Sequence, residues 1–271
     1  MARFAIRLAA LLSLLIALVP SVMAQQVLRM STTTSTDNSG LLSYLLPAFE
    51  AESGLKVHVI AVGTGKALEM AKNGDVDVTL VHARPSEDKF VMEGYGVNRC
   101  DVMYNDFIIV GPAGDPAGIK SMKNVIAAMK KIVDANARFI SRGDNSGTDQ
   151  MEKSYWKKVG TQPAGKVYIS AGMGMGEVLT MAAELQAYTL TDRATYVAYR
   201  AKTGLEIAVQ GDPEMFNPYG IIAVNPKKYP DINYKGAMRL IEWITSPAGQ
   251  KRIADFRVEG QQLFFPLAQD R

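Results

Sequence analysis

Strand-like and helix-like segments alternate along this chain from Val27 onward, and this alternation restricts the possible fold more than any other feature. Strands are predicted at Val27–Ser31, Leu55–Val62 and Val76–Ala83. Apolar residues at helical spacing predict a helix from Leu41 to Phe49, with Ser39 as its N-cap, and a second helix at Ala67–Ala71. This β-α-β-α-β order implies an α/β fold with a mostly parallel sheet flanked by helices.

One strand pattern occurs twice in the rest of the chain. Asp106–Gly111 precedes Pro112, and Tyr219–Asn225, of similar composition, precedes Pro226. A second α/β series lies between them, with helices predicted at Met122–Val133, Asp149–Lys158, Glu177–Gln186 and Ala194–Lys202 and strands at Arg138–Ser141, Val167–Ser170 and Ala187–Leu190. Helices at Tyr234–Thr245 and Ala248–Phe256 follow the second pattern.

We therefore predict two domains. Residues 25–105 and 219–271 would form one, and residues 106–218 would form the other, inserted into the first. The two similar strands would cross between the domains and act as a hinge, so that a ligand binds in the cleft between them. A single continuous sheet is the alternative.

The first 24 residues resemble a cleavable signal peptide. Arg3 and Arg7 precede an apolar run, Leu8–Val19, that is too short to span a bilayer. Small residues suit cleavage after Ala24, and no Cys lies there to carry a lipid anchor. We expect an exported, periplasmic protein. Its only cysteine, Cys100, cannot form an intramolecular disulfide, and we expect it to be buried.

The charge argues against a nucleic-acid partner. The whole chain has a formal net charge of +3, and two of these charges belong to the predicted signal peptide. A nucleic-acid-binding domain normally has a strongly basic face. The nearly neutral remainder of the chain therefore favours other classes of ligand.

Three loops that follow predicted strands are candidate binding loops, because open α/β sheets bind ligands at the carboxyl ends of strands. Ser31–Thr36 is a run of six hydroxyl residues before a helix, which suits an anion, although one of them would suffice as a helix cap. Gly63–Lys66 allows close approach of the backbone but is a weak motif and not a phosphate-binding P-loop. Arg142–Thr148 combines a guanidinium with a helix start, which suits a dianion; a surface salt bridge with Asp144 or Asp149 is the alternative for Arg142.

The order of these motifs resembles the tungstate-binding periplasmic proteins of ABC transporters, the TupA family. The resemblance rests on Ser31–Ser35, Val62–Gly65, Val81–Pro85, Ser141–Thr148, Thr191–Thr195 and Phe216–Tyr219 and covers the whole chain after residue 24. It implies a type II periplasmic binding protein fold, a bound tungstate or molybdate, no cofactor, no catalysis, and delivery by a monomer to an ABC transporter permease in the inner membrane. It also implies that the oxyanion site is lined by Thr33, Thr34, Ser35, Thr64, Arg142, Ser146, Gly147 and Thr148.

Other functions remain open at this point. The same donors suit sulfate, and Asp37 or Asp144 could accept the proton of phosphate. A serine hydrolase is disfavoured because the segment around Ser146 is not Gly-x-Ser-x-Gly. A sugar receptor is disfavoured because the loops hold almost no aromatic residues. Ligand contact is left open for Arg84, which follows a strand and could face the cleft, and for Arg193, which with Asp192 is a candidate latch of the closed cleft. For His82 we expect packing and structural hydrogen bonds.

Overall fold

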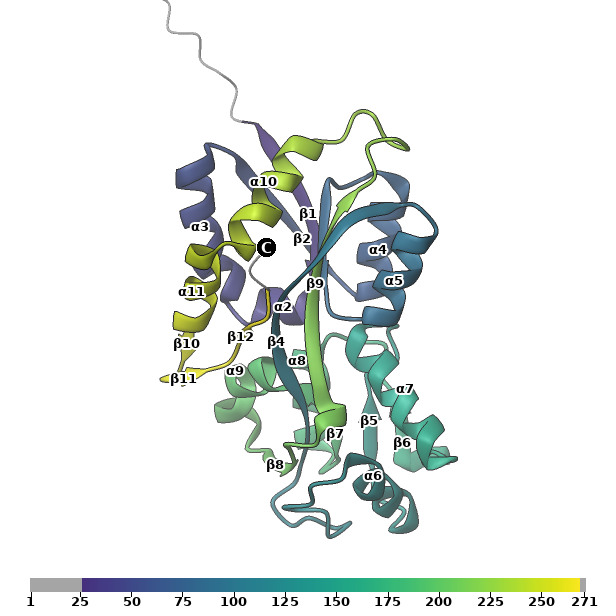
Figure 1. The fold of residues 1–271 in the computed structure, drawn as a ribbon. Helices are drawn as coiled ribbons and strands as arrows, with labels where there is room; N and C mark the ends of the chain where they lie inside the picture. Colours follow the sequence, from purple (N-terminus) through teal and green to yellow (C-terminus); the bar gives the residue numbers. More distant parts are fainter. Residues whose placement is uncertain (1–25, 269–271) are drawn as a thin grey trace, which may run out of the picture.

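The structure, a computed structural model, describes residues 26–268. It has two lobes joined by long strands, one lobe above the other in Figure 1. The predicted signal peptide lies outside the described residues. Within residues 26–268, no helix is both long and apolar enough to cross a membrane. The predicted α/β class is confirmed by the element order.

The upper lobe contains the β-α-β-α-β start that the sequence predicts. β1 (Val27–Thr33) pairs in parallel with both β2 (Lys56–Val62) and β3 (Val78–Val81). α3 (Leu41–Ser53) lies on one side of this sheet, while α4 (Thr64–Asn73) and α5 (Arg84–Met92) lie on the other (Figure 1). The apolar residues that predicted α3 are all buried, as helical spacing requires: Leu41, Leu42, Leu45, Leu46 and Phe49.

Two strands connect the lobes. β4 (Gly96–Gly111) and β9 (Phe216–Val224) form an antiparallel pair, and β9 also runs antiparallel to β3. The last part of β4 continues into the lower lobe, where it pairs with β7 (Thr189–Asp192) and β8 (Glu206–Val209). The sheet is thus mixed: parallel among β1, β2 and β3, and antiparallel around the crossover strands. The predicted boundaries at 105/106 and 218/219 fall inside β4 and β9, and the division into two domains stays a prediction.

The lower lobe is the second α/β series. Phe107 and Ile109 of β4 pack with Phe139 and Tyr155 in its apolar core. Its remaining elements are α6 (Val125–Asp134), β5 (Phe139–Ser141), α7 (Gly147–Val159), a 3-10 turn (Gly165–Val167), β6 (Tyr168–Ser170), α8 (Met175–Glu184), α9 (Arg193–Thr203) and a 3-10 turn (Pro213–Met215).

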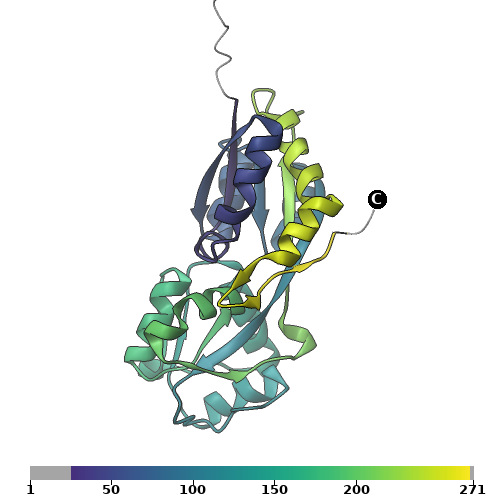
Figure 2. The same ribbon diagram turned by 90° about the vertical axis from the view of Figure 1, so that its left-hand side faces the viewer.

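The end of the chain returns to the upper lobe, where α10 and α11 lie beside α3 (Figure 2). β12 pairs with β4 next to the crossover, so the C-terminal segment covers one side of the connection between the lobes. The elements of this segment are α10 (Tyr234–Thr245), α11 (Pro247–Asp255), β10 (Arg257–Val258), β11 (Gln261–Gln262) and β12 (Phe265–Pro266).

Three local predictions differ from the structure. The hydroxyl run is not a loop: Ser31–Thr33 end β1, and Thr34 begins the short helix α2 (Thr34–Asn38). Ser39 is not the N-cap residue of α3: that position is Gly40, whose φ of 79° lies in the left-handed region that glycine tolerates, while Ser39 Oγ accepts the N–H of Leu41 at 3.3 Å from one residue earlier. The strand-like segment around Cys100 and the strand that follows it are one element, β4. Cys100 itself is buried, as predicted.

Candidate oxyanion-binding site

The hydroxyl residues at the end of β1 are buried and bonded to one another. Thr33 caps α2 because its Oγ1 accepts the backbone N–H of Thr36 at 3.2 Å. The same oxygen lies 3.1 Å from Oγ of Ser35, and both residues are 1% exposed. Thr34 is different: its Oγ1 is buried and has no hydrogen-bond partner within residues 26–268. Capping therefore accounts for Thr33 but not for Thr34.

The other two predicted loops meet across the lobes. Thr64 begins α4 in the upper lobe, Gly147 begins α7 in the lower lobe, and the Gly147 N–H donates to Thr64 Oγ1 at 3.0 Å. Ser146 caps α7, since its Oγ accepts the N–H of Asp149 at 3.2 Å. A Cβ on Gly147 would lie 2.7 Å from the carbonyl oxygen of His82, so the close approach of the lobes here requires glycine.

Arg142 places a positive charge at this interface. It is 2% exposed, although a guanidinium is normally buried only when it is paired and hydrogen-bonded. Its Nη2 donates to Oδ2 of Asp144 at 2.5 Å, so the alternative predicted for it, a salt bridge with Asp144, exists but is not on the surface. Nε and Nη1 have no partner among the described residues. The single ion pair therefore uses one of the three nitrogens.

The same region holds further buried donors without partners. The loop that contains Gly172 and Gly174 lies next to both Arg142 and Thr34. The Gly172 N–H donates to the Arg142 carbonyl at 2.7 Å, and a Cβ on Gly174 would lie 3.9 Å from Thr34 Oγ1. Buried polar groups are normally hydrogen-bonded, so orphaned ones indicate an absent ligand or water. In the predicted motifs, the unpaired atoms within the described part of the chain are Thr34 Oγ1, Ser141 Oγ, Arg142 Nε and Nη1, and Thr148 Oγ1.

The carboxylates around these donors are already occupied. Asp144 accepts from Arg142 and, through Oδ1, from the Ser146 N–H at 3.1 Å. Asp149 accepts the N–H groups of Gly143 and Asn145 at 3.2 and 3.0 Å. Asp192 caps α9 and accepts the N–H and hydroxyl of Thr195 at 2.9 and 2.7 Å, and burial raises the pKa of Asp192.

His82 has a larger part in this site than its position after β3 suggests. It is 4% exposed, and its Nε2 lies 3.2 Å from Ser35 Oγ while its Nδ1 lies 3.0 Å from Oδ1 of Asn217 on β9. Burial, and then the charge of Arg142, lowers the pKa of His82 to about 4 even though the Asn217 hydrogen bond acts to raise it. His82 is therefore neutral at pH 7. Asn217 lies in the Phe216–Tyr219 motif, but its contact with His82 has no local sequence signal, because the two residues are 135 positions apart.

Three other basic residues of the sequence analysis lie outside this buried set. The Arg84 side chain is 50% exposed and its Nε donates to Asp88 at 2.7 Å. Arg193 Nε and Nη2 donate to the two carboxylate oxygens of Asp106 at 2.7 and 2.6 Å. Lys66 is exposed, with Nζ 3.1 Å from Glu69.

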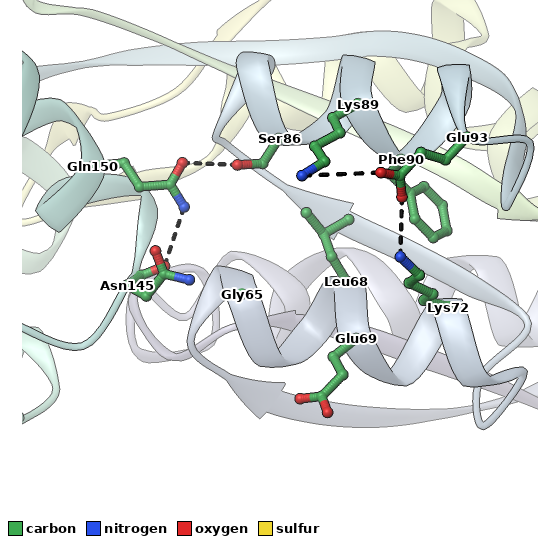
Figure 3. Close-up of a pocket in the computed structure, with 10 residues that line it drawn as sticks. All are labelled: Gly65, Leu68, Glu69, Lys72, Ser86, Lys89, Phe90, Glu93, Asn145 and Gln150. Atoms are coloured by element: carbon green, nitrogen blue, oxygen red, sulfur yellow. Dashed lines mark hydrogen bonds and ion pairs between the residues drawn. The ribbon is translucent and has the colours of Figure 1, made fainter.

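A groove of about 460 Å³ opens beside the site, between α4, α5 and the start of α7 (Figure 3). Ser86 Oγ donates to Gln150 Oε1 at 2.8 Å, and Gln150 Nε2 donates to the Asn145 carbonyl at 3.1 Å. These bonds tie α5 of the upper lobe to the loop and helix that carry Arg142 and Thr148. The groove is lined by Gly65, Leu68, Glu69, Lys72, Ser86, Lys89, Phe90, Glu93, Asn145 and Gln150, so none of the orphaned donors faces it.

Known proteins with the same architecture support one family. A model of the PBP superfamily domain matches residues 23–248. The tungstate-binding protein TupA of Peptoclostridium acidaminophilum is 50% identical over 243 residues, which cover 88% of this chain and 85% of that protein. The crystal structure of the tungstate ABC transporter from Geobacter sulfurreducens is 58% identical with a TM-score of 0.80, covering 86% of this chain and 100% of that one. The tungstate-binding protein TupA from Desulfovibrio alaskensis is 48% identical with a TM-score of 0.78, covering 90% and 100%.

Proposed function

Since this chain belongs to the TupA family of tungstate-binding proteins, within the PBP superfamily, we propose that it captures tungstate between its lobes and delivers it to an ABC transporter permease. One observation supports the site more than any other: most of the buried side-chain atoms without partners in residues 26–268 lie in the motifs that predicted it, namely Thr34 Oγ1, Ser141 Oγ, Arg142 Nε and Nη1, and Thr148 Oγ1. The proposed lining is Thr33, Thr34, Ser35, Thr64, Arg142, Ser146, Gly147 and Thr148.

A tetrahedral dianion fits the chemistry of these groups. It would accept hydrogen bonds from Arg142 Nε and Nη1 and from the hydroxyls of Thr34 and Thr148, which would satisfy each of those donors. The start of α7 adds partial positive charge from backbone N–H groups.

Phosphate fits less well than tungstate. At neutral pH, tungstate, molybdate and sulfate have no proton to donate, whereas phosphate retains one and gains from a carboxylate that accepts it. The carboxylate oxygens of Asp144, Asp149 and Asp192 already accept N–H or O–H groups of the protein. This arrangement disfavours phosphate, and molybdate is proposed as a second ligand because it has the same shape and charge as tungstate.

The lobes suggest how capture and release would work. Thr64 and Gly147 touch across the cleft, so an anion held by both lobes would stabilise this arrangement relative to an open one. The two crossover strands β4 and β9 would act as the hinge. Export through the predicted signal peptide would place the protein in the periplasm, where a permease of the inner membrane is accessible.

Binding without catalysis is part of the proposal. Within residues 26–268, Ser146 Oγ serves as the cap of α7, and the described hydrogen bonds of His82 go to Ser35 and Asn217 instead. Ser146 thus lacks the adjacent base that a nucleophilic serine requires. Two of the relatives named above are likewise described as tungstate-binding proteins.

Isothermal titration calorimetry with tungstate tests the site. Replacing Thr148 with Val removes one orphaned hydroxyl at nearly constant volume, and a hydrogen bond to a charged group is worth about 1.5–3 kcal/mol, so binding should weaken roughly 10- to 150-fold. Thr79→Val is the matched control, because Thr79 Oγ1 is also buried without a partner in the described residues but lies on β3. Equal affinities of the two variants would contradict the assignment.

A further inference from the structure

A chain of side-chain hydrogen bonds runs from the hydroxyl turn, residues 31–36 where β1 meets α2, to the crossover strands of the proposed hinge. It passes from Thr33 to Ser35 at 3.1 Å, to His82 at 3.2 Å and to Asn217 at 3.0 Å. Asn217 Nδ2 then donates to Oδ1 of Asn105 at 2.6 Å. Because Asn105 and Asn217 are directly paired across β4 and β9, the chain ends at the point where the crossover strands connect the lobes.

The direction of this chain follows from its hinge end. In the assigned amide orientation, Asn217 Nδ2 donates to Asn105, so the Asn217 carbonyl oxygen faces His82 and accepts a hydrogen there. Nδ1 of His82 therefore carries the single ring hydrogen of the neutral imidazole. The ring is held in place by stacking on Tyr219, with centroids 4.7 Å apart and planes 23° apart.

The other ring nitrogen is then an acceptor. Nε2 of His82 can only accept from Ser35 Oγ, so the Ser35 hydrogen points to His82. Ser35 in turn accepts from Thr33 Oγ1, which accepts the backbone N–H of Thr36 at 3.2 Å and the Thr36 hydroxyl at 2.6 Å. The hydroxyl hydrogens of Thr33, Ser35 and Thr36 are thus all used within the chain.

We propose that His82 is a positioning residue whose Nδ1–H tautomer sets the direction of this chain, and that it thereby leaves Thr34 as the hydroxyl of the turn that donates to the anion. This inference rests on the proposed function and refines it, since Thr33 and Ser35 then support the turn rather than giving their hydroxyl hydrogens to the ligand. The orphaned, buried Thr34 Oγ1 agrees with this division of roles.

The ring tautomer is measured directly by the ¹⁵N shifts of His82 in the anion-free protein at pH 7. The proposal requires a protonated, pyrrole-type Nδ1 and a bare, pyridine-type Nε2. The opposite tautomer or a doubly protonated ring would overturn it. The assignment of the His82 signals comes from their loss in the His82→Gln variant.

Two substitutions of His82 separate positioning from simple packing. The Gln side chain reaches the Nε2 position and can accept from Ser35, whereas the Asn side chain reaches only the Nδ1 position and cannot. We expect His82→Gln to bind tungstate about tenfold more tightly than His82→Asn by calorimetry. Equal losses in both variants, at equal thermal stability, would contradict a positioning role.

The donor assignment is tested within the turn. Thr34→Val should weaken tungstate binding roughly 10- to 100-fold, and Thr79→Val again serves as the control with a buried hydroxyl outside the site. Wild-type affinity in Thr34→Val would overturn the assignment. If the wild-type protein bound no tungstate, the proposed function and the donor assignment would both fail, whereas the ring spectrum would still decide the direction of the chain.

Discussion

Replacing Gly147 with Ala tests whether the anion site depends on contact between the lobes. The added Cβ would lie 2.7 Å from the His82 carbonyl oxygen and 3.1 Å from its Nδ1. The closer atom belongs to the backbone and cannot rotate away, so the lobes must separate by several tenths of an ångström or more. Gly147 begins α7 without a left-handed φ, so alanine itself suits the position.

The magnitude follows from the bonds that separation would weaken. The Gly147–Thr64 hydrogen bond spans the lobes, so it would lengthen when they separate. An anion held by donors of both lobes would then have to lengthen its hydrogen bonds to the donors of one lobe. Losing one or two hydrogen bonds to a charged ligand corresponds to about 2–5 kcal/mol, which is roughly 30- to 5,000-fold in Kd. In the open, anion-free protein that the proposed hinge requires, the lobes are apart and the added methyl does not meet His82. That form should be unaffected or more stable, because alanine favours a helix over glycine by up to about 1 kcal/mol.

Calorimetry measures the change in tungstate affinity. Urea unfolding of the anion-free protein measures the change in stability separately. Gly114→Ala is the control, since a Cβ at Gly114 meets nothing within 4 Å and its φ is not left-handed. A Gly147→Ala protein that binds tungstate within threefold of wild type would refute the reasoning, because the site would then form without this close approach.

Three further predictions concern charge, pH and shape. Arg142→Ala should weaken tungstate binding more than 100-fold, as expected for a buried charged donor, whereas Lys66→Ala should change it less than about threefold because Lys66 is exposed; comparable losses in titrations would contradict the site. Between pH 6.5 and 4 the unfolded chain protonates His82, whereas the folded protein keeps it neutral. Acidification should therefore lower the free energy of unfolding of the wild type by about 2–4 kcal/mol more than that of His82→Gln. Urea titrations at pH 4 and 7 measure this difference. Burial raises the pKa values of Glu87 and Glu152 to about 7, so these two groups stabilise the fold on acidification, but they do so equally in the wild type and in His82→Gln. Tungstate should decrease the radius of gyration in X-ray scattering, and an unchanged radius would count against a hinge.

Much of the fold was predictable because apolar spacing and burial agree. β3 reads Val-Thr-Leu-Val and is wholly buried, and the leucines of α3 recur on one face. α5 was missed because its sequence is polar and only Glu87 and Phe90 are buried in it. β8 was missed because it has four residues, of which two are buried.

The candidate site was predictable to the extent that its chemistry is local in the sequence. A hydroxyl run and an arginine before a helix can be recognised one motif at a time, and the structure brings them together. The role of His82 could not be found in this way, because its partners Ser35 and Asn217 lie 47 and 135 residues away. The parallel pairing of β1 with β3 brings Ser35 to it, and the crossover strand β9 brings Asn217. The left-handed Gly40 likewise replaced the predicted cap Ser39, since the preceding short helix was not expected.

The melting temperature of residues 25–271 with tungstate, molybdate, sulfate and phosphate tests the central claim most directly. A ligand at 1,000 times its Kd adds about 4 kcal/mol of stability, which corresponds to an increase on the order of 10 °C for a protein of this size. The account predicts such an increase with tungstate and little change with phosphate. A larger increase with phosphate than with tungstate, or no increase with any of the four anions, would contradict it.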